Sequence, residues 1–149
     1  MRAVVQRVLR AEVRSGGDIL GTIGRGLLVF VGVALGDADG DARWMAEKLA
    51  GLRIFEDGEG AMNLSLEDLG ASLLLVSQFT LLADARKGRR PSFSAAARGP
   101  EALRLYESVC DLLAAAGLAV EKGRFGADMQ VELVNDGPVT ILLDSAKTF

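Results

Sequence analysis

The sequence predicts a mixed α/β fold: a largely antiparallel β-barrel or sandwich with two main helices, in a single domain over residues 1–149. Three observations lead to this prediction. Short segments of strand character, separated by glycine-containing turns, fill the first third of the chain and its C-terminal end. Two longer segments carry apolar residues at helical spacing. No linker-like or low-complexity segment divides the chain, and its length suits one domain.

The first third of the chain is expected to form short strands. We predict strands at residues 3–8, 11–14 and 19–23, with a hairpin-type turn at residues 15–18, Ser-Gly-Gly-Asp. The uninterrupted apolar run from Leu27 to Val33 is typical of a strand that is buried on both faces.

Two amphipathic helices are expected. The first follows the acidic segment 36–41, because carboxylates stabilise a helix N-terminus. Its apolar positions recur at helical spacing: Ala42, Met45, Ala46, Leu49 and Leu52. The second begins near Pro100, since proline suits the first helical turn, and it stops at Gly117. Cys110 borders the apolar side of this helix, so we expect a core residue there and not a nucleophile.

The remaining segments complete the predicted barrel or sandwich. Residues 56–60 read as a turn, 84–92 as a basic loop and 135–140, from spacing alone, as a hairpin turn. The other strands are predicted at residues 53–55, 72–82, 119–121, 129–134 and 139–143.

The absence of histidine excludes more chemistry than any other feature of the composition. Without imidazole there can be no Ser-His-Asp triad, no Cys-His pair and no histidine-bearing metal site. The single cysteine cannot form an internal disulfide or a redox pair. Asp37, Asp39 and Asp41 lack the glycine and glutamate spacing of a calcium-binding loop. We therefore expect neither a metal nor a cofactor.

The charge and hydropathy of the chain leave two questions open. A net charge of −3 argues against nucleic-acid binding through overall charge, but it does not exclude a local basic patch. Hydrophobic residues make up 50% of the chain, which fits either a well-filled core or apolar surface covered by a partner subunit. The longest apolar runs, 27–35 and 73–76, fall well short of the roughly 20 residues of a membrane span. We expect a cytoplasmic protein without a membrane partner.

Three segments could carry chemistry, and each also has an ordinary structural interpretation. Residues 77–80, Ser-Gln-Phe-Thr, bring two hydroxyls and an amide to the end of a buried strand, where they either serve a site or cap the sheet. Residues 135–140 contain Gly-Pro and could be a simple hairpin. Residues 86–90 hold four cations around a glycine, an arrangement that suits phosphate contacts or a merely solvated loop.

Together these segments closely resemble the D-aminoacyl-tRNA deacylase family. The resemblance covers essentially the whole chain, in order. It is carried by residues 1–8 (MRAVVQRV), 77–81 (SQFTL), 86–93 (RKGRRPSF), 123–129 (GRFGADM) and 135–140 (NDGPVT). The residues 82–85, Leu-Ala-Asp-Ala, depart from the Tyr and Thr that relatives often carry there.

The resemblance implies a homodimeric tRNA-proofreading hydrolase with shared active sites. Its substrate would be the ester between a D-amino acid, or glycine, and the terminal adenosine of tRNA. The resemblance places Ser77 to Thr80 in the substrate pocket and implies a cis bond between Gly137 and Pro138, which would enter from the other subunit to exclude L-amino acids. Such a rigid wall suits the task, because even a whole methylene group discriminates by only about 1–3 kcal/mol in an apolar pocket.

The resemblance implies catalysis at Ser77, Gln78, Phe79 and Thr80. Thr80 is the obvious nucleophile, but its hydroxyl needs a base and neither motif supplies one. We therefore predict substrate-assisted hydrolysis, in which the 2′-hydroxyl of the terminal ribose activates or positions water. Backbone N–H groups around Gln78, Phe79 and Thr80 would hold the oxyanion, and one such donor is typically worth about 2.7–4 kcal/mol. Thr80 then positions and does not attack.

Further assignments follow from the same resemblance. Met129 and Phe125 are expected to line or brace the pocket, and Arg7 to anchor the turn at Gly137 and Pro138; core or surface roles are the alternative for all three. The expected contacts with the tRNA backbone are four cations: Arg86, Lys87, Arg89 and Arg90.

Two other functions remain open from the sequence. In the first, the chain is a non-catalytic RNA-binding module that uses the basic loop, and residues 77–80 merely cap a strand. In the second, it is a dimeric hydrolase of free D-amino-acid esters that needs no tRNA body. Hydrolysis assays separate all three.

Overall fold

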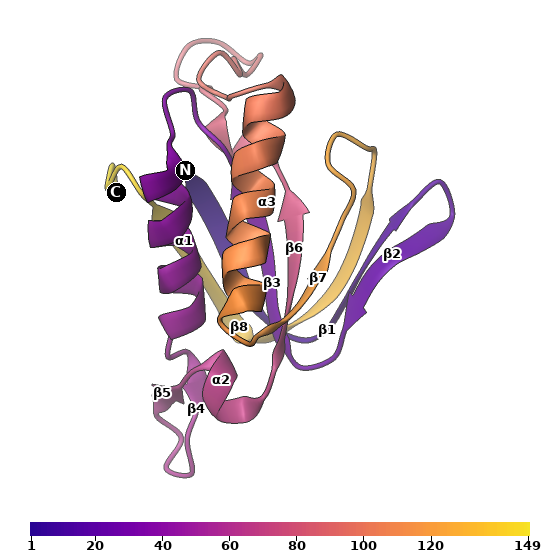
Figure 1. The fold of residues 1–149 in the computed structure, drawn as a ribbon, viewed down its shortest axis with the longest axis vertical. Coiled ribbons are helices and arrows are strands. Elements are labelled where there is room, and N and C mark those ends of the chain that lie inside the picture. The colour runs from indigo at the N-terminus through magenta and orange to yellow at the C-terminus, as the bar shows by residue number, and fades with distance from the viewer.

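A six-stranded sheet built around one long central strand forms the framework of the chain, described over residues 1–149 in a computed structural model (Figure 1). The central strand, β1 (Arg2–Ser15), pairs antiparallel with β3 (Gly26–Gly32) along its first half. Its second half pairs antiparallel with β2 (Asp18–Ile23). The long strand β8 (Gln130–Asp144) pairs antiparallel with β1 along most of its length.

Two parallel strands extend the sheet beyond β3. β6 (Ser72–Ser77) pairs parallel with β3, and β7 (Ala119–Lys122) pairs parallel with β6. The sheet curls until β2 lies against these two strands. A Cβ atom on Gly21 of β2 would lie 3.1 Å from Leu74 Cδ1 of β6 and 3.3 Å from Glu121 Cβ of β7. This nearly closed, mixed sheet with two main helices confirms the predicted fold class.

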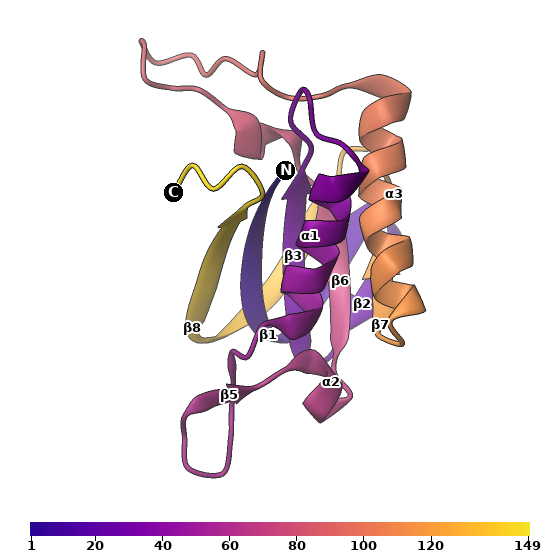
Figure 2. The same cartoon turned by 60° about the vertical axis from the view of Figure 1, so that its left-hand side comes forward.

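Both main helices lie side by side on one face of the sheet (Figures 1 and 2). α1 (Asp39–Gly51) and α3 (Gly99–Ala115) connect the parallel strands, and Arg104 Nη1 of α3 lies 2.6 Å from Asp39 Oδ1 of α1. The other elements are one short helix, α2 (Leu66–Leu69), and a small hairpin of β4 (Phe55–Glu56) and β5 (Met62–Leu64). No helix of the structure is both long and apolar enough to cross a membrane.

The core has a part on each face of the sheet, and β3 contributes to both. Leu27, Val29 and Val31 pack into the larger cluster beneath the helices, whereas Leu28 belongs to the smaller cluster on the opposite face. Successive side chains of a strand point to opposite faces, so this confirms the strand buried on both sides. Cys110 is only 3% exposed, and its burial raises the pKa of its thiol to about 11, which confirms it as a core residue.

Several predicted boundaries were wrong because pairing with distant strands overrides local signals. The predicted strands 3–8 and 11–14 form the single strand β1, which continues through register shifts opposite β8. The predicted strand at 53–55 is reduced to the two residues of β4. The predicted strand 72–82 ends at Ser77, and the 3₁₀ helix η1 (Phe79–Leu82) follows it.

The predicted hairpin at residues 135–140 was also wrong. The predicted strands 129–134 and 139–143 do not pair with each other, because both halves pair with β1 as parts of β8. Gln6 pairs with Thr140 and Val8 with Asn135, so the extra residues of β8 bulge opposite Arg7. A β-bulge of this kind re-aims side chains without ending the strand.

Candidate functional site

The segment Ser77 to Thr80 lies where the sheet ends and the chain turns into η1. The backbone N–H of Gln78 donates to Val31 O at 2.7 Å, the last ladder bond between β6 and β3. Beyond it, Leu81 N donates to Gln78 O at 3.2 Å and closes the 3₁₀ turn. Ser77 and Gln78 are partly buried, whereas Phe79 and Thr80 are exposed. The segment therefore presents its polar groups at the surface from a rigid support.

Two backbone donors in this segment are free. The N–H groups of Phe79 and Thr80, the first two residues of η1, have no acceptor within the chain. This is the usual state of the first N–H groups of a helix. The Gln78 side-chain amide donates to Thr80 Oγ1, so that oxygen already accepts one hydrogen bond. Thr80 can still donate its own proton to a bound group.

Two residues that the sequence analysis did not assign to the site support it from behind. A Cβ atom on Gly32 would lie 2.7 Å from Gln78 O and 2.6 Å from Leu82 Cδ2, so only glycine lets η1 approach β3 this closely. A glycine inside a buried strand signals such an approach. Phe93 packs edge-on against Phe79 with ring centroids 5.2 Å apart. No local pattern pointed to that contact.

The basic loop stands next to this segment. Asp84 and Ser92 exchange two backbone hydrogen bonds of 2.8 and 2.9 Å and close its base. Arg86 pairs with Asp84 at 2.7 Å, and this hydrogen bond lowers the pKa of the Asp84 carboxyl. The other three cations make no ion pair within the chain and are exposed: Lys87, Arg89 and Arg90. The loop therefore offers free positive charge to a partner.

Phe125 and Met129 occupy the connection between β7 and β8. Gly123 N donates to Leu75 O at 2.9 Å, which holds this connection beside the end of β6. Phe125 packs against the core with its ring 6.0 Å from the Tyr106 ring. Met129 packs against the smaller cluster, and its Sδ would lie 2.6 Å from a Cβ atom on Gly123. Both side chains therefore brace the fold.

The Gly137-Pro138 segment forms the exposed tip of the bulge in β8. Its peptide bond is cis, as the resemblance implied, and Gly137 has φ +136°. Asn135 holds the bulge together: its Oδ1 accepts from Val139 N at 2.8 Å, and its Nδ2 donates to Val139 O at 3.1 Å. Gly137 and Pro138 are both exposed.

Arg7 supports this bulge from beneath. It is 3% exposed; its Nε donates to Asp136 O at 3.0 Å and lies 3.2 Å from Asp136 Oδ2. Its other nitrogens bond to Ile54 O at 2.7 Å and to Glu56 Oε1 at 3.5 Å. Arg7 thus ties the bulge to the β4–β5 hairpin.

The two candidate segments lie far apart within one chain. Ser77 of β6 pairs with Val31 of β3, which in turn pairs with Ala3 of β1. The bulge in β8 lies opposite Arg7, which is four residues further along β1. Four residues along a strand span about 13 Å, and the three strand spacings from β6 to β8 span about 14 Å. Gly137 and Pro138 therefore cannot reach Thr80 of their own chain.

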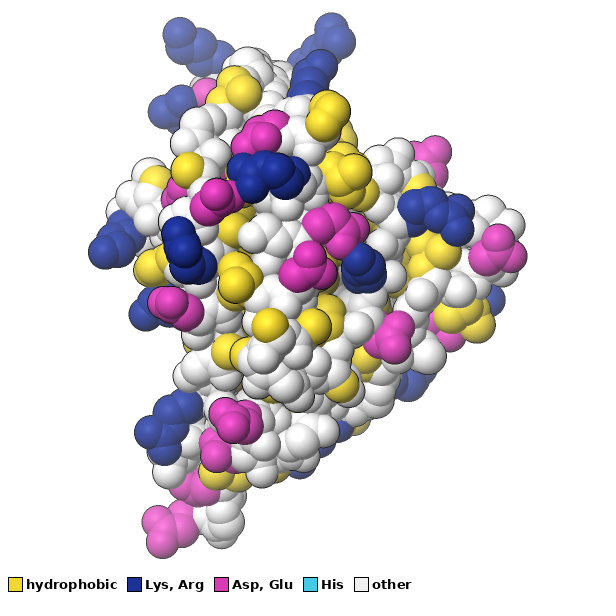
Figure 3. Space-filling view, viewed as in Figure 1, with side chains coloured by type: hydrophobic (Ala, Val, Ile, Leu, Met, Phe, Trp, Pro, Cys, Tyr) yellow, Lys and Arg dark blue, Asp and Glu magenta, His cyan; other side chains and the backbone are white.

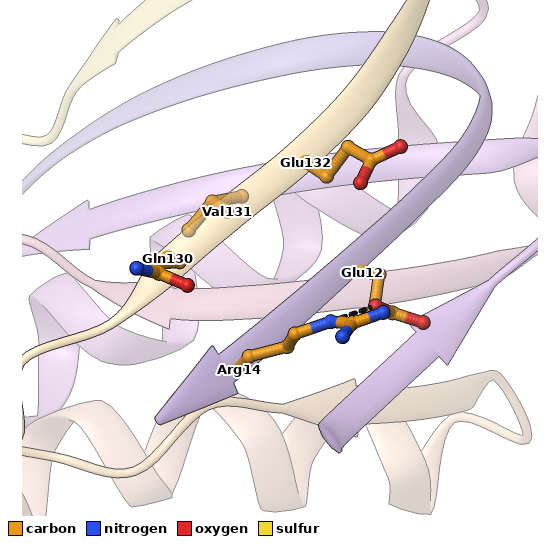
Figure 4. Close-up of a pocket in the computed structure, with 5 residues that line it drawn as sticks. All are labelled: Glu12, Arg14, Gln130, Val131 and Glu132. Carbon is orange, nitrogen blue, oxygen red and sulfur yellow. Dashed lines mark hydrogen bonds and ion pairs between the residues drawn. The ribbon is translucent and has the colours of Figure 1, made fainter. Parts of the chain in front are cut away.

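None of the predicted site residues lines the surface pocket between β1 and β8 (Figure 4). Its charged side chains are already paired, Arg14 with Glu12 and Glu132 with Arg10. No group of three or more His, Cys, Asp or Glu side chains lies close enough together to hold a metal ion.

The family model and the sequence relatives indicate one family, and two solved structures share the fold. The model of the D-Tyr-tRNA(Tyr) deacylase family matches residues 4–144. A D-aminoacyl-tRNA deacylase of Anaeromyxobacter dehalogenans (strain 2CP-C) is 64% identical over 149 residues, which is the full length of both chains. The solved structure of a c-Myc DNA unwinding element binding protein is 42% identical, with a TM-score of 0.90 over 97% of this chain and 98% of its own. A probable eukaryotic D-amino acid tRNA deacylase shares the fold, with a TM-score of 0.81 at 21% identity over 95% of this chain and 97% of its own.

Proposed function

Because the chain belongs to the D-Tyr-tRNA(Tyr) deacylase family, we propose that it hydrolyses the ester of D-aminoacyl-tRNA and of glycyl-tRNA in the cytoplasm and rejects L-aminoacyl-tRNA. The observation that supports this best is the pair of free N–H groups at Phe79 and Thr80, exposed beside a loop with unpaired cations. The N–H groups suit the carbonyl of an ester, and the cations suit the phosphates of tRNA.

The active unit is a homodimer with sites shared between subunits. Gly137 and Pro138 are too far from Thr80 of their own chain to act there, so only a second copy can bring the two together. An apolar patch supports this assembly: Leu142 is 58% exposed and is aligned with Val4 and Phe30 across the sheet, on the face opposite Ala3 and Val5. An exposed patch of this kind is suited to a subunit interface.

The Gly137-Pro138 segment acts as the wall that rejects L-amino acids. It is exposed, yet Asn135 and the buried Arg7 hold it on both sides. A rigid backbone segment can leave room for hydrogen on one side of the α-carbon and none for a side chain, which also admits glycine.

Hydrolysis uses backbone donors and the substrate itself. Water attacks the ester carbonyl carbon, and the N–H groups of Phe79 and Thr80 stabilise the oxyanion that forms. The bond to the ribose 3′-oxygen then breaks, and that oxygen takes a proton. The vicinal 2′-hydroxyl activates or positions the water, because the segment Ser77 to Thr80 contains no general base. Gln78 orients Thr80, which donates a hydrogen bond and does not attack.

A panel of charged tRNAs tests the proposed activity. The purified protein is expected to release the amino acid from D-tyrosyl-tRNA and glycyl-tRNA, and to leave L-tyrosyl-tRNA at the rate of spontaneous hydrolysis. A free D-tyrosine ethyl ester serves as the control for the tRNA body. Cleavage of that ester at a comparable rate would favour the small-molecule hydrolase, and no cleavage of any substrate would favour the RNA-binding module.

Neutralising part of the basic loop should weaken tRNA binding without sequence preference. The variant K87Q/R89Q removes two exposed cations that make no ion pair within the chain. The slope of log K against log salt is expected to become shallower by about 1.4 to 1.8, because each of the two lost phosphate contacts contributes about 0.7 to 0.9. Filter binding of several uncharged tRNAs measures this slope. Weaker binding of one tRNA alone would contradict a backbone contact.

A further inference from the structure

Two arms of opposite charge project from opposite ends of the sheet. The acidic arm comprises residues 55–64, the β4–β5 hairpin, and contains three acids and no cation. The basic loop, residues 84–92, contains four cations and one acid. In Figure 2 the loop projects from the upper end of the molecule and the arm from its lower end, both on the side where β8 lies. Figure 3 shows Lys and Arg gathered at the upper end and acids at the lower tip.

Each arm is joined to one half of the proposed shared site. Arg7 contacts Glu56 of the acidic arm and Ile54 O, which immediately precedes the arm. It also contacts Asp136, next to Gly137. At the other end of the sheet, Phe93 follows the basic loop and packs against Phe79. Whatever brings the Gly137-Pro138 segment to Thr80 therefore brings the base of one arm to the base of the other.

We propose that the acidic arm of each subunit docks on the basic loop of a second copy of the chain. A two-fold interface is self-complementary, so each subunit gives one acidic arm and receives another. Opposite charges at both ends of such an interface would fix its register. The inference rests on the dimer of the proposed function and adds contacts outside its catalytic residues.

The contacts within the chain indicate which charges are available for docking. In the acidic arm, Asp57 Oδ1 accepts from Glu59 N and Ala61 N at 2.9 and 3.0 Å and shapes the turn, while the Glu59 side chain has no partner. In the basic loop, Lys87, Arg89 and Arg90 are unpaired. Glu56 is paired with Arg7, so the arm sets the two charges of Asp57 and Glu59 against three free cations, which leaves positive charge in the loop for RNA phosphates after docking.

A charge exchange between the two arms tests the docking. The variant E59K/A61K reverses the arm tip and leaves Asp57 in its turn, and R89E/R90E reverses the loop. Each is expected to raise the dimer dissociation constant, measured by analytical ultracentrifugation at low salt, by at least about tenfold. The four substitutions together should return it to within about threefold of the wild type. The control E47K/D18N makes the same change in net charge as E59K/A61K, at exposed positions outside both arms, and should leave the constant unchanged.

Cross-linking gives a second measurement that does not depend on dimer strength. The variant E59C/R89C is expected to form a disulfide-linked dimer under mild oxidation, whereas E59C, R89C and E47C/R89C should not. Cys110 is buried and should not interfere. A wild type that is monomeric would overturn the proposed dimer itself. A dimer whose dissociation constant is unaffected by either charge reversal, or that lacks the cross-link, would overturn the docking of the arms alone.

Discussion

Replacing Gly137 with alanine is expected to destabilise the bulge in β8 and to impair the deacylase. A Cβ atom at this position would lie 2.7 Å from Val139 Cγ2 and 2.9 Å from Val139 N, and the φ of +136° is one that alanine rarely adopts. We expect the free energy of unfolding to fall by about 1–3 kcal/mol. We expect kcat/KM for D-tyrosyl-tRNA to fall by about 10- to 100-fold, because small displacements in a site are costly.

Gly24→Ala is the matched control, since a Cβ atom there meets nothing within 4 Å. Urea denaturation and the hydrolysis of D- and L-tyrosyl-tRNA should be measured for both variants. The displaced wall should also narrow the ratio of D to L hydrolysis. A Gly137→Ala protein that is as stable, active and selective as Gly24→Ala would contradict both the strain at Gly137 and its place in the site.

Local sequence patterns predicted the elements in which the order of apolar and polar residues itself shows which side is buried. The run of apolar residues in β3 fills both faces of the sheet, and the spacing in α1 matches the side that packs on it. The continuity of β8 could not be predicted in this way. Gly137 and Pro138 are strong turn signals, and only pairing with β1, at the other end of the chain, shows that the strand resumes beyond them.

The candidate site was predicted only in part for the same reason. Ser77 to Thr80 were identified through the family resemblance, but the expected strand through residue 82 would have buried the polar groups that η1 exposes. Gly32 went unassigned because its role depends on η1 packing against it from a distant part of the chain. Arg7 was expected as an anchor, and its contacts with Ile54 and Glu56 could come only from the tertiary fold.

Removing the 2′-hydroxyl from the terminal ribose is expected to reduce hydrolysis more than any change at Thr80. General acid–base assistance contributes about 10²- to 10⁴-fold, and in the proposed mechanism the substrate hydroxyl supplies it. The single-turnover rate on D-tyrosyl-tRNA ending in 2′-deoxyadenosine should therefore fall by at least about 100-fold. The binding of that tRNA should change little, since phosphate contacts dominate affinity.

Thr80→Ala separates this mechanism from covalent catalysis. Its hydroxyl accepts from Gln78 and, in the proposed mechanism, only positions the substrate, so the single-turnover rate should fall by less than about tenfold. The free N–H groups of Phe79 and Thr80 survive this substitution, because they belong to the backbone. Undiminished cleavage of the 2′-deoxy substrate would remove the role of the ribose. An acyl group trapped on Thr80 would replace substrate assistance with nucleophilic attack, and would require a base that the segment does not contain.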